Sequence, residues 1–216
     1  MNVLLLTGAP RSDRIKNFLM DRADSVVVYD QPLTLEYCQK KKIDFMVVHG
    51  YAPIIKTPVA SAYRYKIVNL HNTFLPWGRG LMGNVWSFFE DTPKGVSLYF
   101  VDTGVDTGKI IAREQVKLSM DLTLKSSWDR LMDRLERLFM DQWEKIVSDN
   151  CEPVPQDSLG SLGSFHNRRL SDQLLSIVGR DWNTSVQRIF ELGVEYHRDP
   201  AAFETKYGVI LDPARR

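Results

Sequence analysis

The sequence predicts an α/β fold in which a mostly parallel sheet is covered by helices on both faces. Three observations favour this class. Short apolar, β-branched runs recur through the first half of the chain, the early ones are separated by segments with helical spacing, and the runs are nearly continuous rather than alternating. Strands that are apolar throughout belong in a sheet buried on both faces, which is the doubly wound arrangement.

The apolar runs define the predicted strands, which are Asn2 to Thr7, Ser25 to Tyr29, Asp44 to His49, Tyr65 to His71, Gly95 to Val101 and Lys109 to Val116. Helical spacing separates the early runs at Arg14 to Ala23 and at Leu33 to Lys41. The last two runs are joined only by Asp102 to Gly108, which is too short for a crossover helix. They are therefore predicted to form an antiparallel hairpin at one side of the sheet.

After Met120 the pattern changes to one long amphipathic helix that runs to about Asp149. Its apolar positions are spaced three and four apart, at Leu124, Trp128, Leu131, Leu135, Leu138 and Ile146. The stretch "NCEPVPQDSLGSLG" then has the composition of a linker or extended connection, and a further helix is predicted from Thr184 to Leu192. We expect a catalytic domain of residues 1–150 and a small C-terminal extension, residues 151–216, that contributes to ligand binding.

Composition excludes several classes of protein. The 216 residues include 28 Lys plus Arg and 27 Asp plus Glu, so no large positive field is available to hold nucleic acid. Only Cys38 and Cys151 are present, which suggests neither a disulfide framework nor a cysteine-based zinc site. The N-terminal apolar run has no basic leader, and no stretch approaches ~20 apolar residues. A cytoplasmic protein without nucleic acid or membrane as partner is expected.

The stretch "NLHNTFLPWGRG" ends a predicted strand on an Asn and a His, two residues apart. Ligands bind beyond the carboxyl ends of strands in open parallel sheets, and residues two apart on a strand point to the same side. Asn69 and His71 therefore project into one space, while Gly78 and Gly80 permit close approach of the chain to a ligand. The alternative is that Asn69 caps a turn and His71 is an ordinary buried histidine.

A second stretch, "VDTGVDTGKI", offers two carboxylates in a glycine-rich hairpin loop. A carboxylate near an imidazole favours its charged form, and an amide donor beside it stabilises an oxyanion. Asn69, His71 and one of these carboxylates would together suit acyl transfer. The alternative is that Asp102 and Asp106 stabilise turns, as Asp beside Gly often does.

Three motifs in register resemble a known family, namely Asn69-x-His71, Leu75-Pro76-Trp77 and Asp106-x-Gly108. The family is that of the formyltransferases that use N10-formyltetrahydrofolate. The longer stretch "HNTFLPWGRGLMGNVWSFFEDTPKGVSLYFVDTGVDTGKII" is similar to the sugar N-formyltransferases, which formylate amino groups of nucleotide-linked deoxysugars. The resemblance covers Asp44 to Val116 well, the first third weakly, and the last quarter only through "GSFHNRRL".

The resemblance implies a Rossmann-like catalytic domain and a catalytic set of Asn69, His71 and Asp106. In this set Asn69 donates a hydrogen bond to the developing oxyanion, and His71 accepts a proton from the attacking amine or stabilises the tetrahedral intermediate. Asp106 fixes the imidazole and an ordered water used in proton transfer. N10-formyltetrahydrofolate is the implied formyl donor, no metal is needed, and a homodimer is expected.

The folate is expected along "HGYAPII" and the hairpin loop, chiefly through backbone groups, by the same resemblance. The residues assigned to it are Tyr51, Ala52, Pro53, Ile54, Ile55, Asp102, Gly104 and Val105. A flat heterocycle with several donors and acceptors is well bound by exposed main chain beside apolar walls. From the residues alone, "YAPII" is also typical of a helix start with Pro53 in its first turn.

The nucleotide sugar is assigned to a second set, which comprises Gly8, Trp77, Arg79, Gly80, Asn84, Phe165 and His166. Arg79 suits a pyrophosphate because its guanidinium makes charge-assisted, often bidentate bonds, and Trp77 offers a flat face. A core tryptophan and a solvent-exposed arginine are the alternative interpretations. Nearby aromatic residues are expected in a helix core, namely Trp86, Phe88 and Phe89.

Some positions depart from the family pattern. Members often have Asn where Gly78 stands, Pro where Gly83 stands, and Ile-Ser-Tyr in place of Asn72-Thr73-Phe74. These positions lie on the expected sugar-nucleotide side, so they bear on substrate identity rather than on reaction type.

Rival functions within and outside the family have specific requirements. The phosphate site of a purine-synthesis formyltransferase resembles a glycine-rich turn after the first strand. Here that turn is "TGAPRSDR", with one glycine and a proline, which disfavours this function. Methionyl-tRNA formylation would need an added nucleic-acid-binding barrel, and formyltetrahydrofolate hydrolase an additional N-terminal domain. A nucleotide-sugar-binding module without catalysis is disfavoured by the intact Asn69, His71 and Asp106.

The expected acceptor is a 4-amino-4,6-dideoxyhexose linked to GDP or dTDP, such as GDP-perosamine. A role in surface polysaccharide synthesis, such as that of the lipopolysaccharide O-antigen, is implied through the family alone.

Overall fold

The structure, a computed structural model, describes residues 1–8, 12–161 and 163–211, so part of the "TGAPRSDR" turn lies outside the described residues. The chain divides into two compact units. The first unit comprises Met1–His71, Ser97–Glu114 and Asp133–Gly160, and the second comprises Asn72–Val96, Gln115–Met132 and Ser161–Arg216. The boundary predicted at residue 150 stays a prediction.

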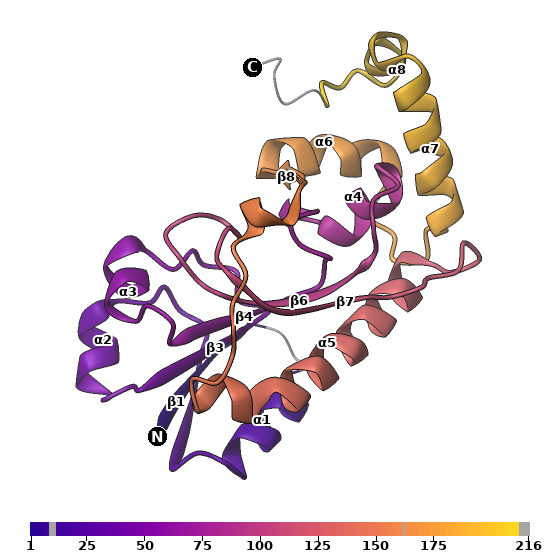
Figure 1. Cartoon of the computed structure of the whole chain (residues 1–216). Coiled ribbons are helices and arrows are strands. Elements are labelled where there is room, and N and C mark those ends of the chain that lie inside the picture. The colour runs from indigo at the N-terminus through magenta and orange to yellow at the C-terminus, as the bar shows by residue number, and fades with distance from the viewer. Residues whose placement is uncertain (9–11, 162, 212–216) are drawn as a thin grey trace. The chain divides into compact units, whose positions relative to one another are not determined.

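A six-stranded sheet in the order β2-β1-β3-β4-β6-β7 organises the chain (Figure 1). Its strands are β1 Asn2–Leu6, β2 Ser25–Tyr29, β3 Phe45–His49, β4 Ile67–His71, β6 Gly95–Phe100 and β7 Ile110–Gln115. The pairs β1–β2, β1–β3 and β3–β4 are parallel, whereas β6 runs antiparallel to β4. The predicted α/β class with a mostly parallel, Rossmann-like sheet is confirmed.

Helices cover both faces of the sheet in the first unit because successive strand residues point to opposite sides (Figure 1). On one face lie α1 (Asp13–Met20) and α5 (Leu124–Val147), where the Trp143 ring packs edge-on to Phe18 and Phe45. On the other lie α2 (Leu35–Lys40) and α3 (Thr57–Ala62). Their buried residues join Leu4, Leu6, Met46, Val48 and Ile67 of the strands.

The alternative interpretation of "YAPII" as a helix start at Pro53 is wrong. Residues 51–56 are irregular, and α3 begins at Thr57 with Pro58 in its first turn. Pro53 and Pro58 both suit the first turn of a helix, so the local pattern alone does not decide which of them begins one. Pro58 is tolerated because the first helical turn has no intrahelical partner for its missing N–H.

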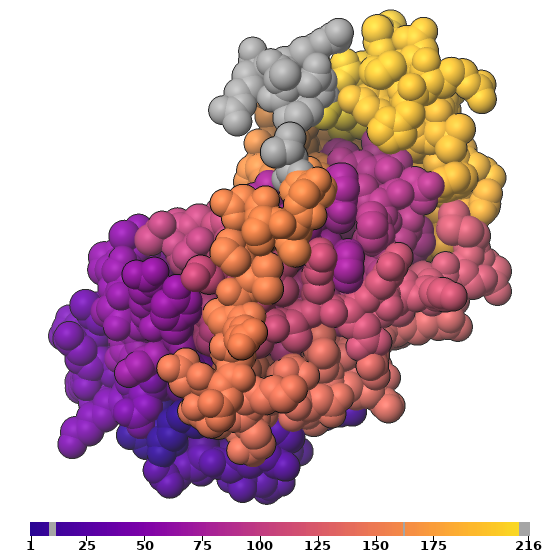
Figure 2. Space-filling view, viewed as in Figure 1, coloured from indigo at the N-terminus to yellow at the C-terminus, as the bar shows by residue number. Residues whose placement is uncertain are grey.

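The proline-rich segment after α5 lies on the surface of the first unit, where Figure 2 shows it in orange. Val154 exchanges two backbone hydrogen bonds with Ile110 of β7, at 2.9 and 2.8 Å. A short 3-10 helix, η1 (Gln156–Leu159), follows at once. The predicted extended connection is therefore fastened to the edge of the sheet, which fixes the position of Gln156.

The second unit combines a small sheet with helices. The strands β5 (Arg79–Gly80) and β8 (Phe165–His166) pair in parallel. The helices are α4 (Gly83–Phe89), α6 (Arg168–Val178), α7 (Val186–Arg198), α8 (Pro200–Tyr207) and the start of α5. Trp86, Phe88 and Phe89 are buried in its core, as predicted. The predicted helix from Thr184 to Leu192 corresponds to α7, which continues to Arg198.

Among the described residues, no helix combines the length and the apolar character needed to cross a bilayer.

We predict that Gly193→Ala destabilises the second unit. A Cβ at Gly193 in α7 would lie 1.8 Å from the Phe89 carbonyl oxygen, so the helices must move apart. Alanine in a helix usually stabilises relative to glycine by about 0.5–1 kcal/mol, but overpacking costs about 1–3 kcal/mol. Urea denaturation should show a lower midpoint for Gly193→Ala. The exposed neighbour provides the control Val194→Ala, and an unchanged or higher midpoint for Gly193→Ala would contradict the close packing.

Candidate active site

Asn69 and His71 lie at the carboxyl end of β4. They are two residues apart on one strand, so both side chains project to the same side of the sheet. Asn69 is half-buried and His71 is 9% exposed. An amide and an imidazole thus share one space in the first unit, at the edge where open parallel sheets bind ligands.

Asp106 reaches this pair from the loop between β6 and β7. One carboxylate oxygen, Oδ2, lies 3.9 Å from Nε2 of His71. The backbone of Asp106 is left-handed, with φ of 54°, and a Cβ at Gly108 would lie 1.7 Å from the Phe100 carbonyl oxygen. The Asp-x-Gly spacing is therefore dictated by the loop, which folds back on β6 closely enough to bring the carboxylate to the imidazole.

Tyr99 joins the site, and sequence reasoning missed it. Its hydroxyl accepts a hydrogen bond from Nδ2 of Asn69 at 2.8 Å and donates one to Oδ1 of Asp106 at 2.5 Å. The ring also packs edge-on to that of His71, with centroids 6.2 Å apart. The available signal was the hydroxyl of a tyrosine in the largely apolar strand "GVSLYF", but nothing in the sequence gives the register that sets Tyr99 opposite Asn69.

Burial raises the pKa of Tyr99 well above its ordinary value, because the low-dielectric surroundings disfavour a phenolate. The neighbouring charge of Asp106 acts in the same direction, while the hydrogen bond from Asn69 opposes it. The phenol is therefore protonated and remains a hydrogen-bond donor at neutral pH.

Gln156 holds the backbone of the same loop. Its Nε2 donates to the carbonyl oxygens of Asp106 and Gly108, at 2.8 and 2.9 Å, and its side chain is buried. The composition of this segment, which is typical of a proline-rich connection, gives no signal for this role. Asp106 is thus held twice, through its carboxylate by Tyr99 and through its main chain by Gln156.

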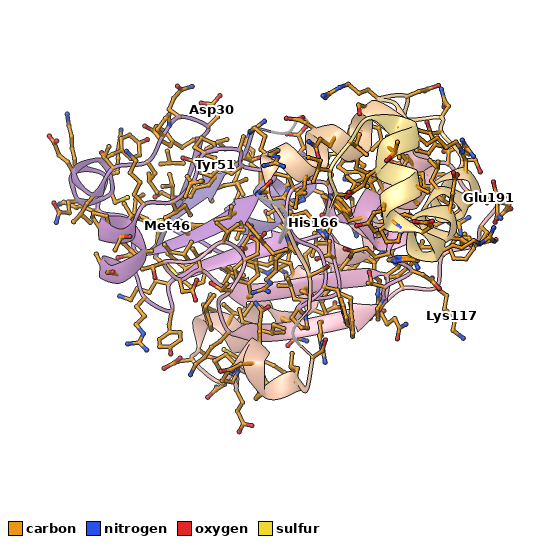
Figure 3. The ribbon with its side chains drawn as sticks, turned by 90° about the horizontal axis from the view of Figure 1, so that it is seen from above. Asp30, Met46, Tyr51, Lys117, His166 and Glu191 are labelled. Atoms are coloured by element: carbon orange, nitrogen blue, oxygen red, sulfur yellow. The ribbon has the colours of Figure 1, made fainter. Side chains whose placement is uncertain are left out.

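The residues predicted to bind folate flank this set within the first unit. Ile54 and Val105 are exposed apolar side chains, at 75% and 43%. Asp102 accepts from the Gly104 amide and the Thr107 hydroxyl, so its carboxylate stabilises its own turn. Tyr51, which Figure 3 shows near the segment of Asp30, donates to a backbone carbonyl there. Their contact with folate stays a prediction.

Gly8 also belongs to the first unit, where its amide donates to the Gly50 carbonyl oxygen at 3.1 Å. The other residues predicted to bind the nucleotide sugar belong to the second unit. There β5 pairs Arg79 with Phe165 and Gly80 with His166. Phe165 is 44% exposed, and Arg79 and Trp77 are half-buried. Their contact with a nucleotide stays a prediction.

His166, labelled in Figure 3, is buried in the second unit. Its ring stacks on Trp86 with centroids 3.9 Å apart, and its Nε2 lies 2.7 Å from a carboxylate oxygen of Glu90. Asn84 is also buried, and its amide donates to the Ser127 hydroxyl. Both side chains stabilise the second unit, and their predicted contact with the nucleotide stays a prediction.

The departures from the family pattern form one packed group. A Cβ at Gly83 would lie 2.2 Å from the Thr73 methyl carbon and 2.7 Å from the Gly78 carbonyl oxygen. Gly78 itself is left-handed, with φ of 70°. Because a threonine methyl fills the space that a side chain at position 83 would take, Thr73 and Gly83 depend on each other.

His49, at the end of β3, is fully buried. Its Nδ1 lies 3.4 Å from the Ser12 hydroxyl, and its Nε2 lies 3.6 Å from a carboxylate oxygen of Glu136. Burial lowers the pKa of His49 from 6.5 to about 4. The Glu136 carboxylate favours the charged ring, but the loss of hydration outweighs it.

The part of the chain that the structure describes contains no group of three or more His, Cys, Asp or Glu side chains that is placed to bind a metal ion. The side chains that converge at the end of β4 bring amide, imidazole, phenol and carboxylate groups together.

Comparison with known proteins identifies the family of this chain. The formyl transferase family matches residues 13–142, and the chain belongs to it. The formyltransferase PseJ from Anoxybacillus kamchatkensis, solved in complex with UDP-4,6-dideoxy-4-formamido-L-AltNAc and tetrahydrofolate, is 32% identical with a TM-score of 0.80. The match covers 88% of this chain and 97% of PseJ. The predicted resemblance to the sugar N-formyltransferases is thereby confirmed.

Two further comparisons concern the fold and part of the sequence. A 4-N formyltransferase from Francisella tularensis has the same fold, with a TM-score of 0.71, 16% identity, and coverage of 88% of this chain and 86% of that one. A methionyl-tRNA formyltransferase from Agathobacter rectalis is 31% identical over 57% of this chain and 40% of its own length. The chain spans about half the length of the curated relatives it matches.

We predict that Gln156→Ala loosens the loop that carries Asp106. The buried carbonyl of Gly108 would lose its donor, which costs about 1–3 kcal/mol locally. Amide exchange of residues 102–110, followed by mass spectrometry, should become faster while the helices of the first unit keep their protection. Ser158→Ala, an exposed change in the same short helix, is the control. Equal amide exchange of residues 102–110 in Gln156→Ala and in the control would contradict the role of Gln156 in holding this loop.

We predict an acid sensitivity that depends on His49. The folded pKa lies below the unfolded one, so the unfolded chain binds the extra proton between about pH 6.5 and pH 4. The free energy of unfolding should therefore fall as the pH drops through this window, by about 2 kcal/mol between pH 7 and pH 5. Urea titrations should show that His49→Gln lacks this part of the loss, and an equal loss in both proteins would rule it out.

Proposed function

We propose that this protein transfers the formyl group of N10-formyltetrahydrofolate to the amino group of a nucleotide-linked 4-amino-4,6-dideoxyhexose. The observation that carries the proposal is the convergence of Asn69, His71 and Asp106 at the end of β4. An amide donor, an imidazole and a carboxylate supply what acyl transfer to an amine needs. The match to PseJ along nearly its whole length supports the substrate class.

In the proposed reaction the sugar amine attacks the formyl carbon, and the electron pair of the carbonyl bond moves to oxygen. Asn69 donates a hydrogen bond to the resulting oxyanion, and His71 takes the proton that the amine nitrogen loses. Collapse of the tetrahedral intermediate breaks the bond from carbon to N10. N10 gains a proton, and tetrahydrofolate leaves. Asp106 orients the imidazole and an ordered water that takes part in the proton transfer.

The donor is proposed to bind to the first unit, along residues 51–55 and the loop from Asp102 to Val105. Exposed backbone in both segments, together with the apolar side chains of Ile54 and Val105, fits a flat heterocycle. The tetrahydrofolate in the PseJ complex supports this choice of donor. Proximity of two bound substrates then supplies much of the rate acceleration.

The nucleotide is proposed to bind to residues of the second unit, with Arg79 on the diphosphate and Trp77 and Phe165 against flat or apolar parts of the ligand. Gly8 and Gly80 allow close approach of the main chain, and Asn84 and His166 complete the assigned set. GDP and dTDP are the expected nucleotides, and the ligand of PseJ adds UDP. We extend the proposal to a cytoplasmic homodimer in surface polysaccharide synthesis.

The test is a scan of acceptors with N10-formyltetrahydrofolate as donor. Release of tetrahydrofolate is followed with GDP-, dTDP- and UDP-linked 4-amino and 3-amino sugars, with methionyl-tRNA and phosphoribosylglycinamide as further acceptors. The expected product is a 4-formamido sugar nucleotide whose mass is increased by one formyl group. Formylation of methionyl-tRNA, to which the curated relatives point, or release of tetrahydrofolate without any formylated acceptor would contradict the proposal.

Within this assay we predict that Asp106→Asn leaves the fold intact and lowers kcat about 10²- to 10⁴-fold. Asparagine keeps the shape and still accepts from Tyr99, but it does not supply the charge that orients the imidazole. Asp30→Asn, an exposed change in the same unit, is the matched control. Turnover near that of the wild type would remove Asp106 from the mechanism.

A further inference from the structure

We propose that Tyr99 is a positioning residue, whose hydroxyl fixes the orientation of the Asn69 amide and of the Asp106 carboxylate. The proposal deepens the function proposed above and rests on it. All of the groups that it concerns belong to the first unit.

The antiparallel register of β4 and β6 brings Tyr99 to the site. Asn69 and Tyr99 are directly opposite, and Leu70 faces Leu98. Side chains that are opposite each other in an antiparallel pair project to the same face of the sheet. The hydroxyl therefore lies between Nδ2 of Asn69, at 2.8 Å, and Oδ1 of Asp106, at 2.5 Å.

The direction of each hydrogen bond follows from the chemistry of the groups. A phenol has one proton, and an ionised carboxylate only accepts, so the Tyr99 proton is donated to Asp106. The phenol oxygen then has only lone pairs to offer Asn69, and it accepts from the NH₂ end of the amide. Because burial keeps Tyr99 protonated, this direction does not change across the neutral pH range.

Fixing the amide matters because its two ends have opposite effects on an oxyanion. An asparagine that rotates by a half turn about its last bond exchanges donor and acceptor. With Tyr99 in place one N–H is held by the phenol and the second N–H is left to bind the oxyanion. Without the hydroxyl the amide oxygen can face the developing negative charge, which would raise the barrier.

The same hydroxyl sets the carboxylate. Tyr99 holds Oδ1 of Asp106, which leaves Oδ2 toward Nε2 of His71, 3.9 Å away. The left-handed backbone at Asp106 brings the side chain to this position, and the hydroxyl fixes its rotation. One buried group thus orders both the oxyanion donor and the partner of the imidazole.

The test is Tyr99→Phe, which keeps the ring packed beside His71 and removes only the hydroxyl. Tyr29→Phe is the matched control, since it removes a hydroxyl bound to a nearby backbone carbonyl of the same unit. We expect kcat of Tyr99→Phe to fall about 10- to 100-fold, less than the loss of an oxyanion donor itself. The KM values for donor and acceptor should stay within about twofold, because positioning acts on the transition state.

The split between kcat and KM separates positioning from a change in substrate binding. An unchanged kcat, or an effect confined to a higher KM, would overturn the proposal.

A readout without turnover separates this proposal from the proposed function. In the wild type one side-chain amide proton of Asn69 is bound to Tyr99 and should exchange slowly with water, as seen by ¹⁵N nuclear magnetic resonance. That protection should vanish in Tyr99→Phe and persist in Tyr29→Phe. If the Asn69 side-chain amide proton exchanges at the same rate in the wild type and in Tyr99→Phe, the proposed orientation is refuted. If the protection is lost in Tyr99→Phe but the wild type formylates no acceptor, only the proposed function is refuted.

Discussion

The antiparallel pairing of β6 with β4 is the constraint on which the site depends. In this register Tyr99 lies opposite Asn69, and Ser97 lies opposite His71. Two neighbouring strands that run parallel need a long crossover connection between them, whereas antiparallel strands can be joined by a short loop. The antiparallel strand instead returns through β7, and the short loop between them supplies Asp106.

Close packing of the backbone keeps that loop where the chemistry needs it. Gly108 lies so near the Phe100 carbonyl that a side chain has no room, and Gln156 binds two carbonyl groups of the loop. Because Gln156 follows the segment that pairs with β7, the proline-rich connection also stabilises the site. A segment with the composition of a linker therefore helps to hold the loop that carries Asp106.

The sequence predicted the parts of the fold and site that depend on local pattern. Asn69 and His71 were predicted because their spacing on one strand is sufficient to bring them together. The assignment of Asp106 over Asp102 came from the family resemblance, and the structure shows Asp102 turned to its own loop. Tyr99 and Gln156 were missed because strand register and the path of an irregular segment are set by tertiary packing.

Burial accounts for a further difference between pattern and structure. His166 and Asn84 are polar residues in motifs that resemble a ligand site, yet both lie in the core of the second unit with protein partners. The Thr73 methyl group occupies the space that a side chain at position 83 would need, and this contact is likewise visible only in three dimensions. Sequence patterns indicate which types of residue a site uses, whereas the hydrogen-bond partners of a side chain and the register of paired strands are known only from the fold.

The central claim is that Asn69 stabilises the formyl oxygen at the end of β4. The most direct measurement is a crystal structure with tetrahydrofolate and a 4-formamido sugar nucleotide bound, in which the contacts of the formamide oxygen are measured. The account predicts that this oxygen lies about 3 Å from Nδ2 of Asn69, with the formamide nitrogen toward His71. A formamide group bound away from the end of β4 would contradict it.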